Sequence, residues 1–154
     1  MSKKSAGILL YRWNTKRLEV FLVHPGGPFF IKKDLGAWSI PKGEFLDEED
    51  PLVAAKREFF EETGSNLQGK FMELTPVKQK SGKVVYAWAV EGEIDAEKIQ
   101  SNIFQIEWPP KSGKFKEFPE IDRGEWFDII KAEQKIIAAQ AELLHELSIK
   151  VKLP

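Results

Sequence analysis

Two apolar runs near the N-terminus have the composition of β-strands. The first is ILLYRW at 8–13 and the second is LEVFLV at 18–23, and both are rich in β-branched and aromatic residues. A polar stretch from Asn14 to Arg17 separates them. This pattern predicts a β-hairpin.

The next segment shows no regular period. Residues 24–33 (HPGGPFFIKK) are rich in glycine, proline and aromatic residues, which predicts a loop of the kind that often carries function. Residues 38–40 then form a short apolar run that ends at the sequence Pro41-Lys42-Gly43. We expect a short strand there.

A helix is predicted from Pro51 to Thr63. Asp50 has the residue type of a helix N-cap, proline suits the first helical position, and Gly64 is a typical helix stop. Apolar residues recur at helical spacing within these bounds: Leu52, Ala55, Phe59 and Phe60.

The second half of the chain predicts two more strands and a second helix. Residues 71–79 and 83–94 have the pattern of strands. The second segment alternates around Val85, Ala87, Ala89 and Glu91. The proline- and lysine-rich residues 107–119 predict a loop. Residues 127–147 predict one long amphipathic helix with an apolar stripe. Its stripe positions are Ile130, Ile137, Ala141, Leu144 and Leu147.

This order of elements predicts an α+β fold in which helices pack on a mixed sheet. A length of 154 residues fits one domain, covering residues 1–154. No internal repeat or low-complexity tract interrupts it.

Composition removes several function classes. The chain has no cysteine, which excludes disulfides, thiolate metal sites and cysteine nucleophiles. A net charge of −1 provides no global field to hold a long nucleic acid. The N-terminal apolar run is too short for a signal peptide or a membrane span, so we expect a cytoplasmic protein without a membrane partner.

The region from 43 to 65 is unusually acidic, and three of its glutamates, Glu58, Glu61 and Glu62, share one face of the predicted helix. Like charges so placed destabilise a helix by about 0.2–0.5 kcal/mol per pair. Arg57 can neutralise part of the cluster, and a divalent ion such as Mg²⁺ or Mn²⁺ can neutralise the rest. An ordinary solvated acidic face is the alternative. A calcium-binding EF-hand is excluded, because its ligand spacing is missing.

The same region resembles the Nudix box, G-x5-E-x7-R-E-U-x-E-E-x-G-U, in which U is a bulky apolar residue. Ser65 departs from the last position of this pattern, and Leu46 and Glu48 depart from softer preferences of the family. The segments 38–43 and Glu120 with 126–127 resemble other parts of Nudix enzymes. Eight positions of the box are in register: Gly43, Glu49, Arg57, Glu58, Phe59, Glu61, Glu62 and Gly64.

The resemblance implies an α/β/α sandwich with the box helix and a C-terminal helix packed on a mixed sheet. It also implies metal ligands at Glu58, Glu61, Glu62 and the Gly43 carbonyl. Arg57 would orient Glu49 and Glu61, and Glu49 would contact Arg57 or a metal-bound water.

A general base is expected to activate the attacking water. Glu62 ranks first and Glu120 second, with Glu61 as a further candidate.

Substrate contacts are expected from lysines and aromatic residues outside the helix. Lysine side chains can meet phosphates and aromatic rings can stack on a base, although each of these residues can equally be a solvated lysine or a core aromatic. His24 and His145 have no assigned role, because a lone histidine here suits packing or the surface. The substrate candidates are Lys42, Lys111, Lys114, Lys116, Phe29, Phe30, Trp88 and Phe115.

The implied reaction is metal-dependent hydrolysis of a phosphoanhydride bond, with a small nucleotide as the partner molecule. A dinucleoside polyphosphate or a nucleoside triphosphate is the expected substrate, since the chain resembles the diadenosine tetraphosphate hydrolase-like and triphosphate pyrophosphohydrolase branches. An ADP-ribose or nucleotide-sugar pyrophosphatase and a non-catalytic nucleotide sensor are the alternatives. The oligomeric state is open.

Overall fold

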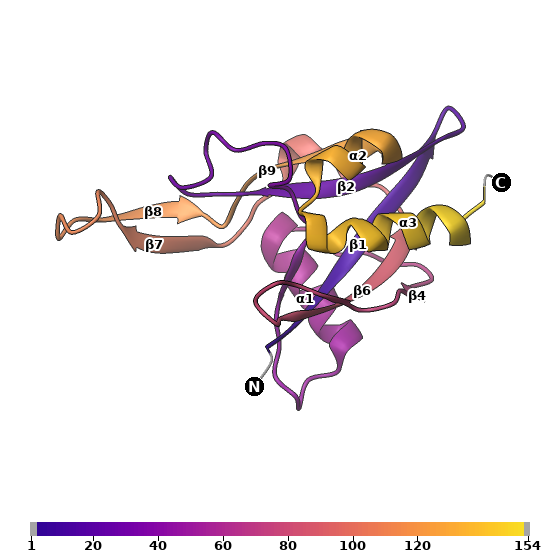
Figure 1. Cartoon of the computed structure of the whole chain (residues 1–154), viewed down its shortest axis with the longest axis horizontal. Coiled ribbons are helices and arrows are strands. Elements are labelled where there is room, and N and C mark those ends of the chain that lie inside the picture. The colour runs from indigo at the N-terminus through magenta and orange to yellow at the C-terminus, as the bar shows by residue number, and fades with distance from the viewer. Residues whose placement is uncertain (1–2, 153–154) are drawn as a thin grey trace.

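The computed structural model describes residues 3–152 of the chain (Figure 1). It begins with the predicted hairpin of β1 (Lys4–Asn14) and β2 (Arg17–Pro25), and both strands extend beyond the apolar runs. Thr15 and Lys16 have φ angles of 51° and 65°, which gives the turn the twist that joins antiparallel strands tightly.

Within the described residues the strands form a seven-stranded mixed sheet, with β4-β6-β1-β2-β9 as its main path. β6 runs parallel to β1, whereas β2 and β3 pair with β1 in the antiparallel sense. The predicted mixed sheet is therefore confirmed. The further strands are β3 (Lys42–Glu44), β4 (Met72–Glu73), β5 (Val77–Lys78), β6 (Val84–Glu91) and β9 (Ile121–Asp128).

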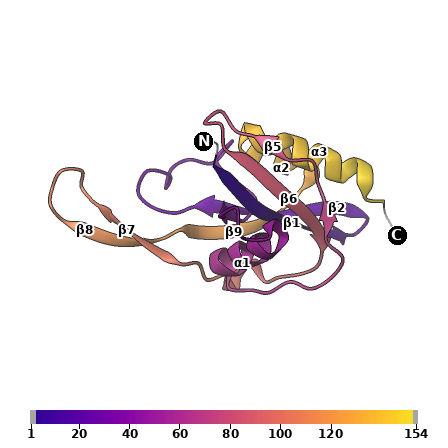
Figure 2. The same cartoon turned by 90° about the horizontal axis from the view of Figure 1, so that it is seen from below.

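Helices cover both faces of this sheet (Figure 2). α1 (Pro51–Thr63) lies on one face, and α2 (Ile129–Lys135) and α3 (Ala141–Lys150) lie on the other. Alternate residues of β1 point to the two faces of the sheet. Ile8 packs in one core cluster with Phe59 of α1, and Leu9 packs in the other core cluster with Leu144 of α3. The predicted α+β sandwich with helices on a mixed sheet is confirmed.

The bounds of α1 agree with its predicted caps. The Asp50 carboxylate accepts a hydrogen bond from the Val53 N–H at 3.0 Å, and Gly64 ends the helix with a φ of 80° and donates to the Phe60 carbonyl. Phe59 is buried against the sheet, which leaves the acidic face of the helix pointing elsewhere.

The predicted loop at 107–119 is wrong. This region completes a two-stranded hairpin of β7 (Ile103–Glu107) and β8 (Phe115–Pro119), which projects from the sheet (Figure 1). The Phe104 and Phe118 rings face one another across the strands at 6.1 Å. Pro109 and Pro110 lie in the connection between the strands, where they cost no ladder hydrogen bond, and Pro119 is the last residue of β8.

The single long helix predicted at 127–147 is also wrong. Residues 127–128 end β9, and the helix breaks after α2 at Ile136, which is extended. A short 3₁₀ turn, η2 (Ala138–Gln140), precedes α3. The break has a structural reason: Trp38 donates to the Lys135 carbonyl and accepts from the Ile137 N–H, so this backbone pairs with a neighbouring segment.

The other strand predictions are partly correct. Trp38 and Ser39 take part in isolated bridges, and the regular strand β3 begins later, at Lys42. The predicted strand at 71–79 is reduced to β4 and β5. A second 3₁₀ turn, η1 (Ala96–Lys98), follows β6. Among the described residues, no helix has the length and apolar character needed to cross a membrane.

Candidate functional site

The box helix brings Glu58 directly against Gly43 of β3. A Cβ atom built on Gly43 would lie 1.9–2.5 Å from the Glu58 carboxyl atoms. The glycine is therefore required by a close approach, and the Glu58 carboxylate occupies the space that a larger residue would fill. The Glu58 side chain is only 13% exposed.

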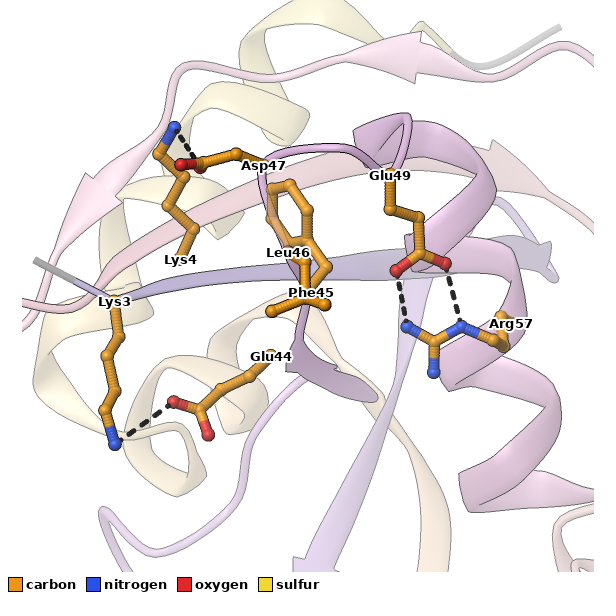
Figure 3. Close-up of a pocket in the computed structure, with 8 residues that line it drawn as sticks. All are labelled: Lys3, Lys4, Glu44, Phe45, Leu46, Asp47, Glu49 and Arg57. Carbon is orange, nitrogen blue, oxygen red and sulfur yellow. Dashed lines mark hydrogen bonds and ion pairs between the residues drawn. The ribbon is translucent and has the colours of Figure 1, made fainter.

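Arg57 collects three carboxylates of the box. Its guanidinium donates to both oxygens of Glu49, at 2.9 and 3.0 Å, and through Nη1 to Glu58 at 2.8 Å and to Glu61 at 3.2 Å (Figure 3 shows the Glu49 pair). This hydrogen bonding lowers the pKa of Glu49 and raises the pKa of Arg57. The planar fork suits this arrangement, since it fixes Glu49 in two places while neutralising its neighbours.

Glu62 meets the backbone of Lys42, next to the Gly43 that Glu58 contacts. Its carboxylate accepts from the Lys42 backbone N–H at 3.1 Å. Burial raises the pKa of Glu62 to about 8 and also raises the pKa of Glu58. Burial lowers the pKa of the Lys42 ammonium. Both carboxyl groups thus lack a cation sufficient to offset their burial.

Glu62 opens into a pocket of about 300 Å³, which Lys42 and Glu120 also line. Glu120 comes from the junction of β8 and β9, far along the chain, and its charge contributes to the raised pKa of Glu58 and of Glu62. The remaining lining is mostly apolar. It consists of Val23, Pro25, Phe30, Ala37, Ser39, Ile40, Ile121 and Ile137.

The donor set of this site fits a divalent cation. Glu58 and Glu62 are hard oxygen ligands whose raised pKa a cation would relieve, and the Gly43 backbone lies beside Glu58. Among residues 3–152, no three acidic or histidine side chains gather as a ready-made metal site. The reason is that Arg57 holds the carboxylates of Glu58 and Glu61.

A second pocket of about 520 Å³ lies on the Glu49 side of Arg57 (Figure 3). Its other acidic residues are paired with lysines, Glu44 with Lys3 at 3.7 Å and Asp47 with Lys4 at 3.2 Å. These acidic residues of the box loop therefore pair with lysines near the N-terminus, whereas Glu58 pairs with Arg57.

The structure separates the candidate substrate residues into four groups, of which the residues of the β7–β8 hairpin are the last. Lys42 and Phe30 line the 300 Å³ pocket. Trp88 is 9% exposed in the core cluster that contains Phe59, so packing is the reading that the structure favours for it. Phe29 is 55% exposed and meets the Trp108 ring edge-on at 5.3 Å.

The hairpin residues Lys111, Lys114, Lys116 and Phe115 are exposed on the projecting arm. In the described part of the chain, they are absent from the lining of the 300 Å³ pocket. Their distance from it means that they can meet only a substrate that extends beyond the pocket.

Sequence reasoning missed Ile137, which enters the pocket because the C-terminal helix breaks there. A helical pattern carries no sign of that break, so no local signal could have found it. His24 is almost completely buried, at 1% exposure, and packs edge-on against Trp38 at 5.1 Å.

Comparison with solved structures shows the same fold in several proteins. An Ap4A hydrolase of C. elegans, solved as a binary complex, has a TM-score of 0.67 and 23% identity, with 96% of each chain covered. The NUDIX domain of Shewanella oneidensis NrtR, complexed with ADP ribose, has a TM-score of 0.67 and 17% identity, covering 99% of this chain and 90% of that one. A Nudix hydrolase of M. smegmatis, RenU, has a TM-score of 0.61 and 18% identity, covering 98% and 88%.

A search of curated proteins finds no match. The protein-family model for the NUDIX domain, in contrast, matches residues 1–147, which is nearly the whole chain. The sheet with helices on both faces and the box carboxylates around Arg57 agree with that match. This chain therefore belongs to the Nudix hydrolase family.

Proposed function

We propose that the protein hydrolyses a phosphoanhydride bond in a nucleoside diphosphate linked to another moiety, with Mg²⁺ or Mn²⁺ as its cofactor. One observation carries the proposal: Glu62 of the box helix and Glu120 of the distant β8–β9 junction line one pocket with Lys42, and the Glu58 carboxyl group lies against the neighbouring Gly43. A pocket in which titratable groups with shifted pKa values converge is the expected form of an active site.

The residues divide into two tasks. Glu58, Glu61, Glu62 and the Gly43 carbonyl would hold the metal, and Arg57 with Glu49 would keep the carboxylates in place. A bound divalent ion would neutralise phosphate charge and lower the pKa of a water molecule. Lys42 adds a positive charge at the same pocket for a further phosphate oxygen.

The base that accepts the proton of the attacking water comes from Glu62 or Glu120. Both line the pocket, whereas both oxygens of Glu61 lie within 3.4 Å of Arg57 Nη1. Glu62 ranks first because it lies on the box helix with the metal ligands. A base has to be within hydrogen-bond reach of the water, so the two variants Glu62→Gln and Glu120→Gln separate them.

The pocket suits one part of a nucleotide. Its volume is at the low end of the range for small-molecule sites, and its apolar lining with the half-exposed Phe30 offers a surface for a base or ribose. A dinucleoside polyphosphate or a nucleoside triphosphate is the proposed substrate, with the rest of the molecule outside the pocket. ADP-ribose is the second candidate, because the structurally similar NrtR domain was solved with that ligand.

A non-catalytic nucleotide sensor is the alternative from another class. Sensor domains of this family tend to lose carboxylates of the box, and here Glu49, Glu58, Glu61 and Glu62 are all present. Binding of a nucleotide without turnover, in the presence of metal, would identify a sensor.

The test is a nucleotide panel with Mg²⁺ or Mn²⁺, in which the products are resolved to show which bond breaks. Dinucleoside tetraphosphates, nucleoside triphosphates and ADP-ribose belong in the panel, with EDTA and the Glu58→Gln variant as controls. We expect turnover that EDTA and the variant abolish. Full turnover in EDTA, or by Glu58→Gln, would overturn the proposed mechanism.

A further inference from the structure

The buried His24 holds hydrogen bonds at both of its ring nitrogens. Nδ1 lies 2.8 Å from Asp122 Oδ1, and Nε2 lies 2.7 Å from the Lys33 carbonyl oxygen. A carbonyl oxygen has no proton to give, so Nε2 must donate. Nδ1 and the Asp122 carboxyl group share the second hydrogen bond, so both ring nitrogens of this buried side chain are satisfied.

Asp122 occupies an irregular position in the sheet. His24 pairs with Arg123 and Pro25 pairs with Ile121, so Asp122 is the extra residue of a β-bulge between β2 and β9. Bulges turn side chains away from the regular alternation and occur next to active sites. The neighbouring backbone is tightly fixed, because Gly26 donates to the Glu120 carbonyl at 2.8 Å.

The space at this junction is also full. A Cβ on Gly26 would lie 2.0 Å from the Pro119 carbonyl oxygen. The Asp122 bulge therefore sets the path of the chain just before it, where Glu120 and Ile121 reach the pocket.

The other hydrogen bond of His24 fixes the loop that carries Phe30. Lys33, whose carbonyl accepts from His24, donates its own N–H to the Phe30 carbonyl at 2.9 Å. Phe30 is part of the pocket lining. The His24 side chain thus connects two walls of the pocket, the loop that carries Phe30 and the β8–β9 junction that carries Glu120.

We propose that His24, hydrogen-bonded to Asp122 and to the Lys33 carbonyl, is a positioning residue that holds Phe30 and Glu120 at the nucleotide pocket. His24 itself does not line the pocket and acts through these two residues. The proposal rests on the proposed function, because it assigns a role in building that site.

Several charged groups lie around His24. Asp122 and Arg123 face it from β9, and the Arg123 guanidinium lies over the Trp38 ring that packs on His24. The Asp34 carboxylate accepts a hydrogen bond from the Trp38 indole N–H, and Lys135 of α2 forms an ion pair with Asp34. Arg123 and the Asp34–Lys135 pair meet Trp38, so Asp122 is the charge that contacts the imidazole directly.

The experiment compares His24→Gln and Asp122→Asn with a control, His145→Gln, which changes an exposed histidine of α3. In His24→Gln, amide exchange of Gly26 and Lys33 should accelerate, and kcat should fall about 10- to 100-fold on the best nucleotide, with KM raised, since small displacements at a reacting centre have effects of this size.

Asp122→Asn keeps the shape of the pair and serves if His24→Gln does not fold. Its neutral amide is a weaker hydrogen-bond acceptor than the carboxylate, so kcat should fall and KM should rise in the same sense as in His24→Gln, whereas His145→Gln should leave kcat, KM and amide exchange unchanged. Wild-type amide exchange of Gly26 and Lys33 in His24→Gln, or wild-type kcat and KM in both variants, would overturn the proposal. If no nucleotide is hydrolysed, the proposed function fails separately, and NMR with amide exchange still tests whether His24 holds the two walls.

Discussion

At the scale of single residues, the site depends on close approaches between small and charged groups. Gly43 leaves room for the Glu58 carboxylate, and Arg57 gathers the carboxylates around it. The atoms that a side chain at position 43 would meet are those of the Glu58 carboxyl group, the flexible end of that side chain. A methyl group there can be accommodated by moving Glu58, so its effect on stability is small while its effect on the site is large.

We therefore predict that Gly43→Ala lowers kcat/KM about 100-fold, because it displaces a proposed metal ligand, while the free energy of unfolding changes by less than about 1 kcal/mol. Steady-state kinetics and urea unfolding measure the two quantities. Gly92→Ala is the matched control, since its nearest atom, Leu10 Cδ1, is 3.3 Å away. Wild-type kinetics in Gly43→Ala would mean that the position of Glu58 does not matter for turnover.

A second prediction concerns pH and the metal-free protein. The pKa of Glu62 rises from 4.5 to about 8 on folding, so the folded state binds this proton more tightly than the unfolded state. The contribution of this proton to the free energy of unfolding is complete below about pH 4.5 and is lost as pH rises through 8. In EDTA, wild-type protein should thus lose stability between pH 5 and 8 relative to Glu62→Gln. Denaturation at several pH values checks this, and parallel curves for the two proteins would contradict it.

At the scale of elements, α1 and the β7–β8 hairpin contrast in how they serve the site. α1 is capped at both ends and packed on the sheet, which presents its carboxylates from a rigid support. The hairpin projects from the body and carries exposed lysines, and Trp108 at its end contacts Phe29, the residue before Phe30 (Figure 1). The hairpin can therefore contact only the outer part of a substrate.

The corresponding prediction is that Lys111, Lys114 and Lys116 together favour long phosphate chains. Their replacement by alanine should reduce kcat/KM more on a dinucleoside tetraphosphate than on ADP-ribose, because each lysine acts on an increasingly anionic chain. Rising salt should weaken the wild-type preference, since exposed charges are screened beyond about 8–10 Å. Equal losses on both substrates would show that these lysines only contact solvent.

At the scale of the whole molecule, metal binding and folding should be linked. The proposed ligands come from β3 and α1, and Glu120 comes from the β8–β9 junction, so the proposed site exists only in the folded chain. An ion that binds only the folded state stabilises it.

We predict that Mg²⁺ at about 100 times its Kd stabilises the fold by about 2.7 kcal/mol, which raises Tm by several degrees for a chain of this size. Calorimetry with Mg²⁺ and with EDTA measures this shift. Glu58→Gln should lose most of it, and Glu142→Gln, on the exposed side of α3, should keep it. The same Tm with Mg²⁺ and EDTA would contradict the proposed metal site.

The sequence by itself determined the features that depend on neighbours along the chain. The caps of α1 follow from Asp50, Pro51 and Gly64, the β1–β2 hairpin follows from its apolar runs and turn, and the acidic cluster follows from residues three and four apart on a helix. These local patterns, with the order of the elements, also predicted the helices on a mixed sheet.

Only the tertiary structure decided which distant residues meet. The pocket combines Phe30, Glu62, Glu120 and Ile137, and their meeting depends on strand register, on a bulge and on a helix break. The β7–β8 hairpin and the break after α2 were missed because contacts across the chain outweigh the local signals of proline and helical period. Periodicity shows which face of an element is apolar, and packing alone selects the partner of that face.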